Sequence, residues 1–289
     1  MTGHEPRIAF GLSTRELTRR VKRVAWTMIG VCITGLMLFP LYWIVNLSLS
    51  RQVDTLRYPP PLIPLNLTLD GYRDALGTIG PSVLSSFIYS AGTVAVTMLV
   101  ATPAAYALAT LRSRISLGLL CALILAEMAP GFVIANSLYS VFSSLGWLNS
   151  YQAVILADSS LAVPFATIIM RAFMVGIPRG LSEAAMIDGA GHWSIFRMVY
   201  VPLSRTALLT AGLFSFLFGW GDFLFALVLN NDPNRTPITV SIYQFIGSTT
   251  VEWPAVMATA VMASIPAVLL VSMAQRYVAV GVTAGAIKE

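Results

Sequence analysis

Three carboxylic acids, Glu127, Asp158 and Asp222, lie inside long apolar stretches of the chain. An ionisable side chain is costly at membrane depth, so it usually faces a cavity or a partner there. The three acids are therefore candidate binding residues for a polar solute. The structural alternative is that each acid only holds neighbouring helices together inside the protein.

Asp222 has an aromatic neighbour two positions earlier, Trp220, within the segment Phe218–Leu227. The Trp220 ring can stack on the apolar face of a sugar while the Asp222 carboxylate accepts hydrogen bonds from its hydroxyl groups. Both residues are candidate members of a solute path. The alternative for Asp222 is a structural acid that is paired or lies near the outer membrane interface.

Glu127 stands just before a helix-breaking pair, Pro130-Gly131. A break of this kind can open a cavity at the middle of a membrane. Asn136 and Tyr139 follow about one and two turns beyond the break, and we expect them to share its face. The alternative for Glu127 is an ion pair with Arg171 or with a partner subunit. Asp158 lies near the start of its apolar run, which predicts a position at the outer interface.

Common catalytic and cofactor-binding patterns are missing from the sequence. A phosphate-binding loop needs a lysine after a glycine-rich turn, and the chain does not have one, since its only lysines are Lys22 and Lys288. ATP hydrolysis by that route therefore requires another polypeptide. A zinc site or a histidine-based triad would need more ligands than the chain offers, which are His4, His192, Cys32 and Cys121. We expect no enzyme activity, cofactor or metal in this chain.

A short polar segment, 178–202, separates two apolar runs. Ser182 is a candidate helix cap, and Glu183 would then lie in the first turn, where the helix dipole favours negative charge. Ala184 and Ala185 keep the side chains small, so another surface can approach the backbone. Gly189, directly after Asp188, is a predicted helix stop.

The composition predicts an all-α integral membrane protein. The 289 residues are 56% hydrophobic and 11% charged, against about 25% charged in soluble domains, and the mean hydropathy is +0.76. Six apolar runs reach the roughly 20 residues that a bilayer requires. They are Val24–Ser50, Pro81–Leu111, Ile115–Leu138, Gln152–Met174, Leu203–Leu229 and Pro254–Val280. The first run is too long for a cleaved signal peptide.

The distribution of lysine and arginine sets the orientation of the six spans. Basic residues gather in the segment before the first span, in the loop after the second span and around segment 178–202. By the positive-inside rule, both termini and segment 178–202 are cytoplasmic. The net charge of +5 therefore reflects membrane topology and not a nucleic-acid partner. The predicted parts are a cytoplasmic tail at 1–23, a transmembrane domain at 24–280 and a second cytoplasmic tail at 281–289.

The polar segment resembles the Glu-Ala-Ala loop of the permeases of ABC importers. Glu183, Ala184, Ala185 and Gly189 match that motif, as do Val199 and Pro202, whereas Val201 stands where leucine is usual. The Trp220–Leu227 segment is similar to the fifth-span motif of maltose-type sugar permeases, although Gly221 replaces its usual asparagine. The sequence thus resembles the shorter, second permease of a maltose-type carbohydrate importer.

The resemblance implies the six-helix type I importer fold and a multi-pass protein of the cytoplasmic (inner) membrane. It implies that a coupling helix containing Glu183, Ala184, Ala185, Asp188 and Gly189 docks on a cytoplasmic ATPase. The implied partners are a related permease, forming a heterodimer, a dimeric ABC ATPase that carries ATP and Mg, and an extracytoplasmic solute-binding protein or lipoprotein. The implied substrate is a sugar or sugar derivative.

Two other classes of function are open at this point. Glu127 would suit a proton-coupled secondary transporter of a small polar solute, but such folds usually show repeated halves, and the sequence shows none. A membrane-embedded protease with a pair of acids is the other class, and the residues that flank Glu127, Asp158 and Asp222 do not fit it.

Overall fold

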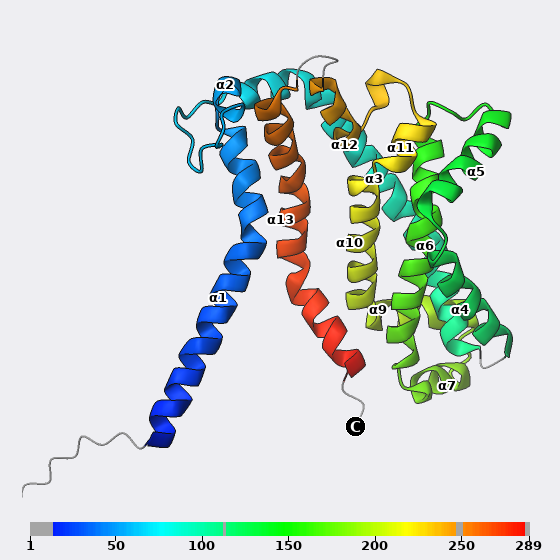
Figure 1. Ribbon diagram of the computed structural model, residues 1–289. Helices are drawn as coiled ribbons and strands as arrows, with labels where there is room; N and C mark the ends of the chain where they lie inside the picture. The colour runs from blue at the N-terminus through cyan, green and yellow to red at the C-terminus, as the bar shows by residue number, and fades with distance from the viewer. Residues whose placement is uncertain (1–13, 112–113, 247–250, 287–289) are drawn as a thin grey trace, which may run out of the picture.

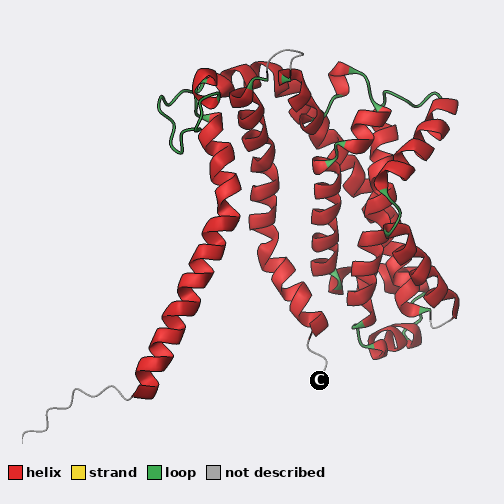
Figure 2. Ribbon diagram, in the orientation of Figure 1, coloured by secondary structure: helices red, strands yellow, loops and turns green. Residues whose placement is uncertain are grey.

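A computed structural model describes residues 14–111, 114–246 and 251–286 of the chain. Within these ranges the protein is helical, and the only β-type pairing is an isolated bridge between Ile246 and Val251. Figure 2 shows helices joined by short loops from one end of the molecule to the other. The prediction of an all-α membrane protein is confirmed.

Four single helices are long and apolar enough to cross a membrane. They are α1 (Thr14–Ser48), α3 (Asp70–Thr110), α6 (Tyr151–Val175) and α13 (Trp253–Ala286). Two bent pairs bring the number of spans to six. One pair is α4 (Arg114–Glu127) with α5 (Gly131–Ser144), bent by 96°, and the other is the segment His192–Leu203 with α10 (Arg205–Gly221), bent by 79°.

Several helix boundaries differ from the sequence-based expectation. Helix α3 begins at Asp70, well before the predicted span Pro81–Leu111, and runs on through Pro81 for 41 residues in all. A proline removes one backbone hydrogen bond and kinks a helix, and here it does not end it. The break predicted at Pro130-Gly131 is present between α4 and α5. A second break, which we did not expect, separates α10 from α11 (Leu224–Leu229).

The body of the molecule is a packed group of three helices, α3, α6 and α10, with α13 against α3 and α10. Fully buried alanines from the three central helices form much of this contact, and they include Ala101, Ala105, Ala166, Ala207 and Ala211. Small residues let membrane helices approach closely. At Gly219 a Cβ atom would lie 2.9 Å from the Cα atom of Ser90, so that crossing of α10 and α3 requires glycine.

The remaining elements divide between the two ends of the body (Figure 1). The start of α1, the end of α13 and α7 (Arg179–Ile187) lie at one end, while α2 (Gln52–Thr55) and α12 (Ile238–Ser241) lie at the other. This arrangement agrees with the predicted topology, in which both termini and segment 178–202 share one side of the membrane. Helix α1 meets the body mainly at α13, and the Ser48 hydroxyl also forms a hydrogen bond of 2.9 Å with the Tyr72 hydroxyl of α3. Within its apolar stretch Lys22–Ser48, only Asn46 and Ser48 are buried.

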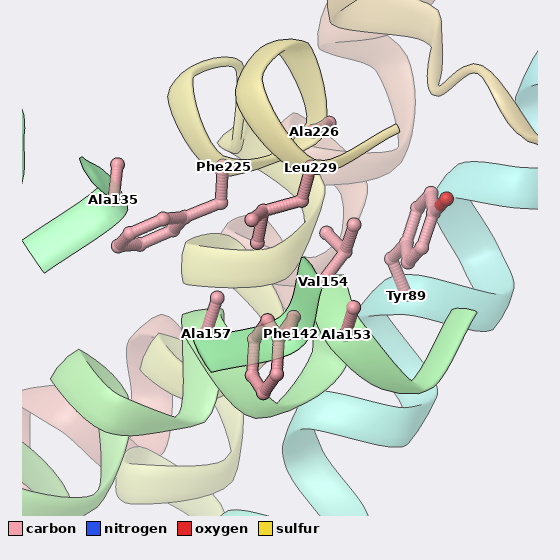
Figure 3. Packing of buried hydrophobic residues seen from close by; sticks show 9 residues of the cluster. All are labelled: Tyr89, Ala135, Phe142, Ala153, Val154, Ala157, Phe225, Ala226 and Leu229. Carbon is pink, nitrogen blue, oxygen red and sulfur yellow. The ribbon is translucent and has the colours of Figure 1, made fainter. Parts of the chain in front are cut away.

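A compact apolar cluster fixes the outer half of the body. Figure 3 shows Phe225 and Leu229 of α11 directed towards α5 and α6, with the Phe225 ring beside Ala135. Val154 of α6 and Tyr89 of α3 complete the contact. The cluster holds the short helix α11 against its neighbours, although the helix is interrupted between α10 and α11.

Candidate functional site

Segment 178–202 folds into three short helices, and the chain reverses its direction after the first of them. Helix α7 begins after Pro178, and α8 (His192–Ile195) and α9 (Val201–Leu203) follow, with a π-helical turn, η1 (Phe196–Tyr200), between them. The predicted start at Ser182 is wrong, because α7 begins three residues earlier and the Ser182 hydroxyl donates to the Arg179 carbonyl at 2.7 Å. Glu183 therefore lies in the middle of α7, and the first turn has no acid.

Gly189 ends α7 as predicted. Its φ of +84° is in the left-handed region that favours glycine. The Ala190 amide donates to the Ala185 carbonyl at 2.9 Å, and the Gly189 amide donates to the Met186 carbonyl at 3.0 Å. These two bonds form a Schellman motif, which reverses the chain at a helix C-terminus. A Cβ atom at Gly189 would meet nothing within 4 Å, so the conformation and not the space requires glycine.

Helix α7 has one face towards the protein and one towards water. Ala185 and Ala190 pack against an apolar cluster that includes Met170 and Met174 of α6. On the other face Ala184, Asp188 and Ile187 are exposed, and Ile187 is 87% exposed. The two alanines of the motif thus serve different surfaces: Ala185 holds α7 on the protein, and Ala184 lies on its free face.

Aromatic rings attach this segment to the inner end of α3. The ring of Tyr106 lies 4.8 Å from that of Tyr200 and 5.2 Å from that of Phe196. The Tyr106 hydroxyl also donates to the His192 carbonyl at 3.4 Å. These contacts join segment 178–202 to α3, and α7 follows α6 directly along the chain.

Three exposed apolar residues at this end were not expected from the sequence. Ile187, Trp193 and Met198 are 87%, 70% and 72% exposed. Large apolar side chains grouped at an exposed surface mark an interaction site. A hydropathy pattern does not reveal them, because their exposure depends on which face of each short helix meets the protein.

A cavity of about 1010 Å³ lies behind α7. Glu183 lines it together with Arg114, Arg171 and Arg179, from the starts of α4 and α7 and the end of α6. No ion pair joins Glu183 to an arginine within residues 14–111, 114–246 and 251–286. The Glu183 carboxylate is exposed and therefore available to a cation outside this chain.

Asp222 occupies the break between α10 and α11. Its carboxylate accepts hydrogen bonds from the Phe225 amide at 3.1 Å and the Ala226 amide at 2.8 Å. These amides belong to the first turn of α11, where no helical partner is available to them. Thr239 donates its hydroxyl proton to the Asp222 carbonyl. The sequence-based alternative of a structural acid thus describes one role of Asp222.

Asp158 is buried inside the protein, with only 2% of its surface exposed. Its position at the outer interface stays a prediction. Thr93 of α3 donates a long hydrogen bond of 3.5 Å to one carboxylate oxygen. Asp158 and Asp222 line the same cavity, of about 380 Å³, with Phe218 and Phe223 among its apolar walls. Burial could not be read from the sequence, because it depends on which face of α6 meets α3.

Trp220 lies away from this cavity. It is 4% exposed, and its indole N–H donates to the Ala263 carbonyl of α13 at 2.8 Å. Its ring stacks on Phe216 at 5.7 Å and meets Phe87 of α3 at 4.9 Å. In this conformation Trp220 packs α3, α10 and α13 together, and the stacking on a sugar expected from the sequence stays a prediction.

The residues around the other break are not brought together. Glu127 ends α4, and one of its carboxylate oxygens is buried without a hydrogen-bond partner. Asn136 and Tyr139 are exposed on α5, beyond the bend, and no hydrogen bond joins them to Glu127 in the described part of the chain. The suggested pair with Arg171 is absent, because Arg171 donates to the Leu108 carbonyl at 3.3 Å.

The helices and the exposed segment around α7 define a multi-pass membrane protein with an attachment surface at one end. The family of binding-protein-dependent transport system inner membrane components matches residues 98–283. The chain belongs to this family of permease subunits, and it is a protein of the inner membrane. Family membership favours the importer over the proton-coupled transporter considered from the sequence.

Relatives cover almost the whole chain. A probable ABC transporter permease of Sinorhizobium fredii is 32% identical over 273 residues, which are 94% of this chain and 98% of the relative. A trehalose transport system permease of Mycobacterium tuberculosis is 32% identical and covers 91% of this chain and 97% of its own length. A trehalose/maltose permease of Thermococcus litoralis is 29% identical, with 93% and 98% covered.

Solved structures share the fold. A subunit of a bacterial ABC transporter that imports the acidic polysaccharide alginate aligns with a TM-score of 0.74 at 22% identity, over 92% of this chain and 99% of its own. An inward-facing MetNI methionine ABC transporter aligns at 0.57 and 15% identity, over 74% and 99%. The fold is therefore that of ABC importer permeases, as the sequence predicted.

Proposed function

We propose that this chain is the permease subunit of an ATP-driven importer of a sugar or sugar derivative, and that α7 is its coupling helix. The observation that carries the proposal is the exposed α7, which ends in the Schellman turn at Gly189 and continues into the η1 turn that Tyr106 joins to α3. Permease relatives named for trehalose, for trehalose and maltose, and for diacetylchitobiose support the substrate class.

The free face of α7 fits a cytoplasmic ATPase. Ala184 and Asp188 lie on this face, and the apolar side chains of Ile187 and Trp193 are exposed nearby. Apolar anchors with a charged rim are typical of protein interfaces. Glu183 supplies a negative charge for a basic group of the ATPase. ATP and Mg belong to that partner, since this chain has no phosphate-binding loop.

Two further partners complete the importer. Helix α1 leaves its apolar surface uncovered by the rest of the chain, and we assign part of that surface to a related second permease. An extracytoplasmic solute-binding protein or lipoprotein delivers the sugar to the opposite end of the molecule. The substrate crosses between the two permeases.

Movement of α7 drives the transport cycle. When the ATPases close on ATP, they displace α7, and α3 and α6 move with it through the Tyr106 contacts and the direct chain connection. The cavity at Asp158 and Asp222 then changes its access from one side to the other. Among the predicted solute-path residues, Asp222 lines this cavity. Glu127 ends α4, Asn136 and Tyr139 lie on α5, and none of these three residues lines the cavity.

Transport by the reconstituted complex tests this function. The chain is placed in liposomes with its second permease and ATPase, and uptake of a labelled sugar is measured with its binding protein. We expect uptake to require enclosed ATP and to survive a proton uncoupler. Uptake that collapses with the uncoupler and continues without ATP would contradict the proposal and restore the secondary transporter.

A further inference from the structure

The loop between α2 and α3 has an unusual composition. Segment 58–69 contains no charged residue, and its polar side chains are limited to Tyr58, Asn66 and Thr68. The other residues are proline, leucine and isoleucine, and the apolar side chains point outward. Tyr58 is 97% exposed, Ile63 is 72% exposed and Leu67 is 74% exposed. A water-soluble loop rarely gathers so many exposed apolar side chains.

The loop folds back along the outer end of α1. The Tyr42 hydroxyl donates to the Leu62 carbonyl, and the Asn46 side-chain amide donates to the Pro61 carbonyl at 3.1 Å. Tyr42 precedes the end of α1 at Ser48 by six residues, or about 9 Å at 1.5 Å per residue. Figure 1 shows the loop hanging beside α1, on the side away from α13. The loop therefore reaches the depth of the membrane-spanning surface.

The backbone of the loop has few groups that require water. Pro59, Pro60, Pro61 and Pro64 have no N–H group. Side chains of α1 satisfy the carbonyls of Pro61 and Leu62. Irregular backbone is costly in a lipid environment because unpaired N–H and C=O groups lose their hydrogen bonds with water. The proline-rich sequence reduces that cost.

The polar side chains at the end of the loop are also used internally. The Asn66 amide donates to a carboxylate oxygen of buried Asp54 at 3.3 Å. The Thr68 amide donates to the Leu49 carbonyl at 3.0 Å, and the Asp70 amide donates to the Thr68 hydroxyl at 3.2 Å. The exposed surface of segment 58–69 therefore consists mainly of apolar side chains.

We propose that segment 58–69 inserts into the outer leaflet at the boundary between headgroups and acyl chains, and anchors the outer end of α1 to lipid. A protein partner is a poorer match, because interfaces between proteins typically carry a hydrogen bond for every 100–200 Å² or so, and this surface offers few donors. Lipid requires no such bonds. Tyr58, amphipathic and fully extended from the loop, suits the headgroup level.

Spin labels measure the position of the loop in the assembled importer. Ile63→Cys and Leu67→Cys are labelled in a chain whose exposed Cys32 and Cys121 have been replaced by serine. Asn234→Cys, on the exposed loop at the same end of the molecule, is the aqueous control. Collision rates with oxygen, which enters lipid, and with a water-soluble nickel chelate are recorded with and without the solute-binding protein.

We expect the labels at positions 63 and 67 to collide more often with oxygen than with the nickel chelate. The label at position 234 should collide more often with the nickel chelate. Both results should hold with and without the solute-binding protein. Nickel access equal to that at position 234 would overturn the proposal, because the loop would then lie in water. A loop label that collides with neither oxygen nor the nickel chelate would also overturn the proposal, since a protein would then cover the loop. A pattern that changes when the binding protein is added would assign the loop to that partner.

Discussion

Trp220 is buried and Asp222 is half-buried, and these two residues, two positions apart, contact different elements at the break between α10 and α11. The Trp220 ring joins α10 to α3 and α13, whereas the Asp222 carboxylate holds the first amides of α11. Asp222 and Asp158 line the cavity beside the break, and Trp220 does not. The two acids are therefore the stronger candidates for contact with a polar solute in this conformation.

Replacement of Trp220 separates packing from binding. We expect Trp220→Ala to destabilise the protein by about 3–5 kcal/mol, the usual cost of emptying a buried aromatic site. Trp220→Phe keeps a ring and loses the hydrogen bond to Ala263, at a cost of about 1 kcal/mol. Thermal unfolding of the purified complex measures both. An unchanged melting temperature in Trp220→Ala, with transport lost, would instead support stacking on a sugar.

Replacement of Asp158 tests for a role in transport without a role in stability. Asp158→Asn keeps the shape of the side chain and can still accept the Thr93 hydrogen bond. We expect sugar uptake to fall about tenfold or more, corresponding to roughly 1.4 kcal/mol, with the yield of intact complex unchanged. Thr93→Val is the matched variant, because it removes the hydrogen bond and leaves the carboxylate. A larger loss of uptake in Thr93→Val than in Asp158→Asn would show that the bond between α3 and α6 matters more than the charge.

At the scale of elements, the short helices around α7 transmit motion only if they stay attached to α3. The rings of Tyr106, Phe196 and Tyr200 provide that attachment, with centroids 4.8 to 5.2 Å from that of Tyr106. Ala185 of α7 and Ala190, which follows the helix, allow close contact with the protein but supply little apolar area of their own. The aromatic contact is thus the main link besides the chain itself.

Tyr106 therefore governs the efficiency of coupling. We expect Tyr106→Ala to leave ATP hydrolysis near normal and to lower the number of sugar molecules imported per ATP. Tyr106→Phe keeps the ring contacts and loses only a long hydrogen bond of 3.4 Å, so it should resemble the original protein. The ratio of uptake to hydrolysis in liposomes is the measurement. An unchanged ratio in Tyr106→Ala would remove α3 from the coupling route.

The sequence predicted the helix breaks at Pro130-Gly131 and at Gly189, and it missed the break at Asp222. Pro130-Gly131 and Gly189 carry a local backbone restriction, so both positions could be read directly. The break at Asp222 has no proline, and it exists because the carboxylate replaces helical partners for α11. The start of α7 was missed because Pro178 begins the helix without a side-chain cap.

The whole molecule is incomplete on its own. No apolar side chain of α1 within Lys22–Ser48 is buried, and large apolar side chains near α7 are exposed to the cytoplasmic side. The lengths of the apolar runs predicted the six spans, but they could not show which faces of the spans stay uncovered within one chain. Both surfaces follow from an importer built of several subunits, in which this chain provides one half of the path and one docking helix.

Gly189 gives the most direct test of that account. Gly189→Val places a β-branched residue in the left-handed region, which costs at least about 1–2 kcal/mol and should change the direction of the chain after α7. Gly189→Asn tolerates that conformation better. Gly191→Ala is the control, because residue 191 has a φ of −73° and a methyl group there meets no atom within 4 Å.

The measurement is co-purification of the ATPase with each variant, together with sugar-stimulated ATP hydrolysis in the reconstituted complex. We expect Gly189→Val to lose the ATPase or its stimulation while its spans insert normally. Gly189→Asn should be milder, and Gly191→Ala should match the original protein. Full retention of the ATPase and normal stimulation in Gly189→Val would contradict the central claim that α7 couples this permease to ATP hydrolysis.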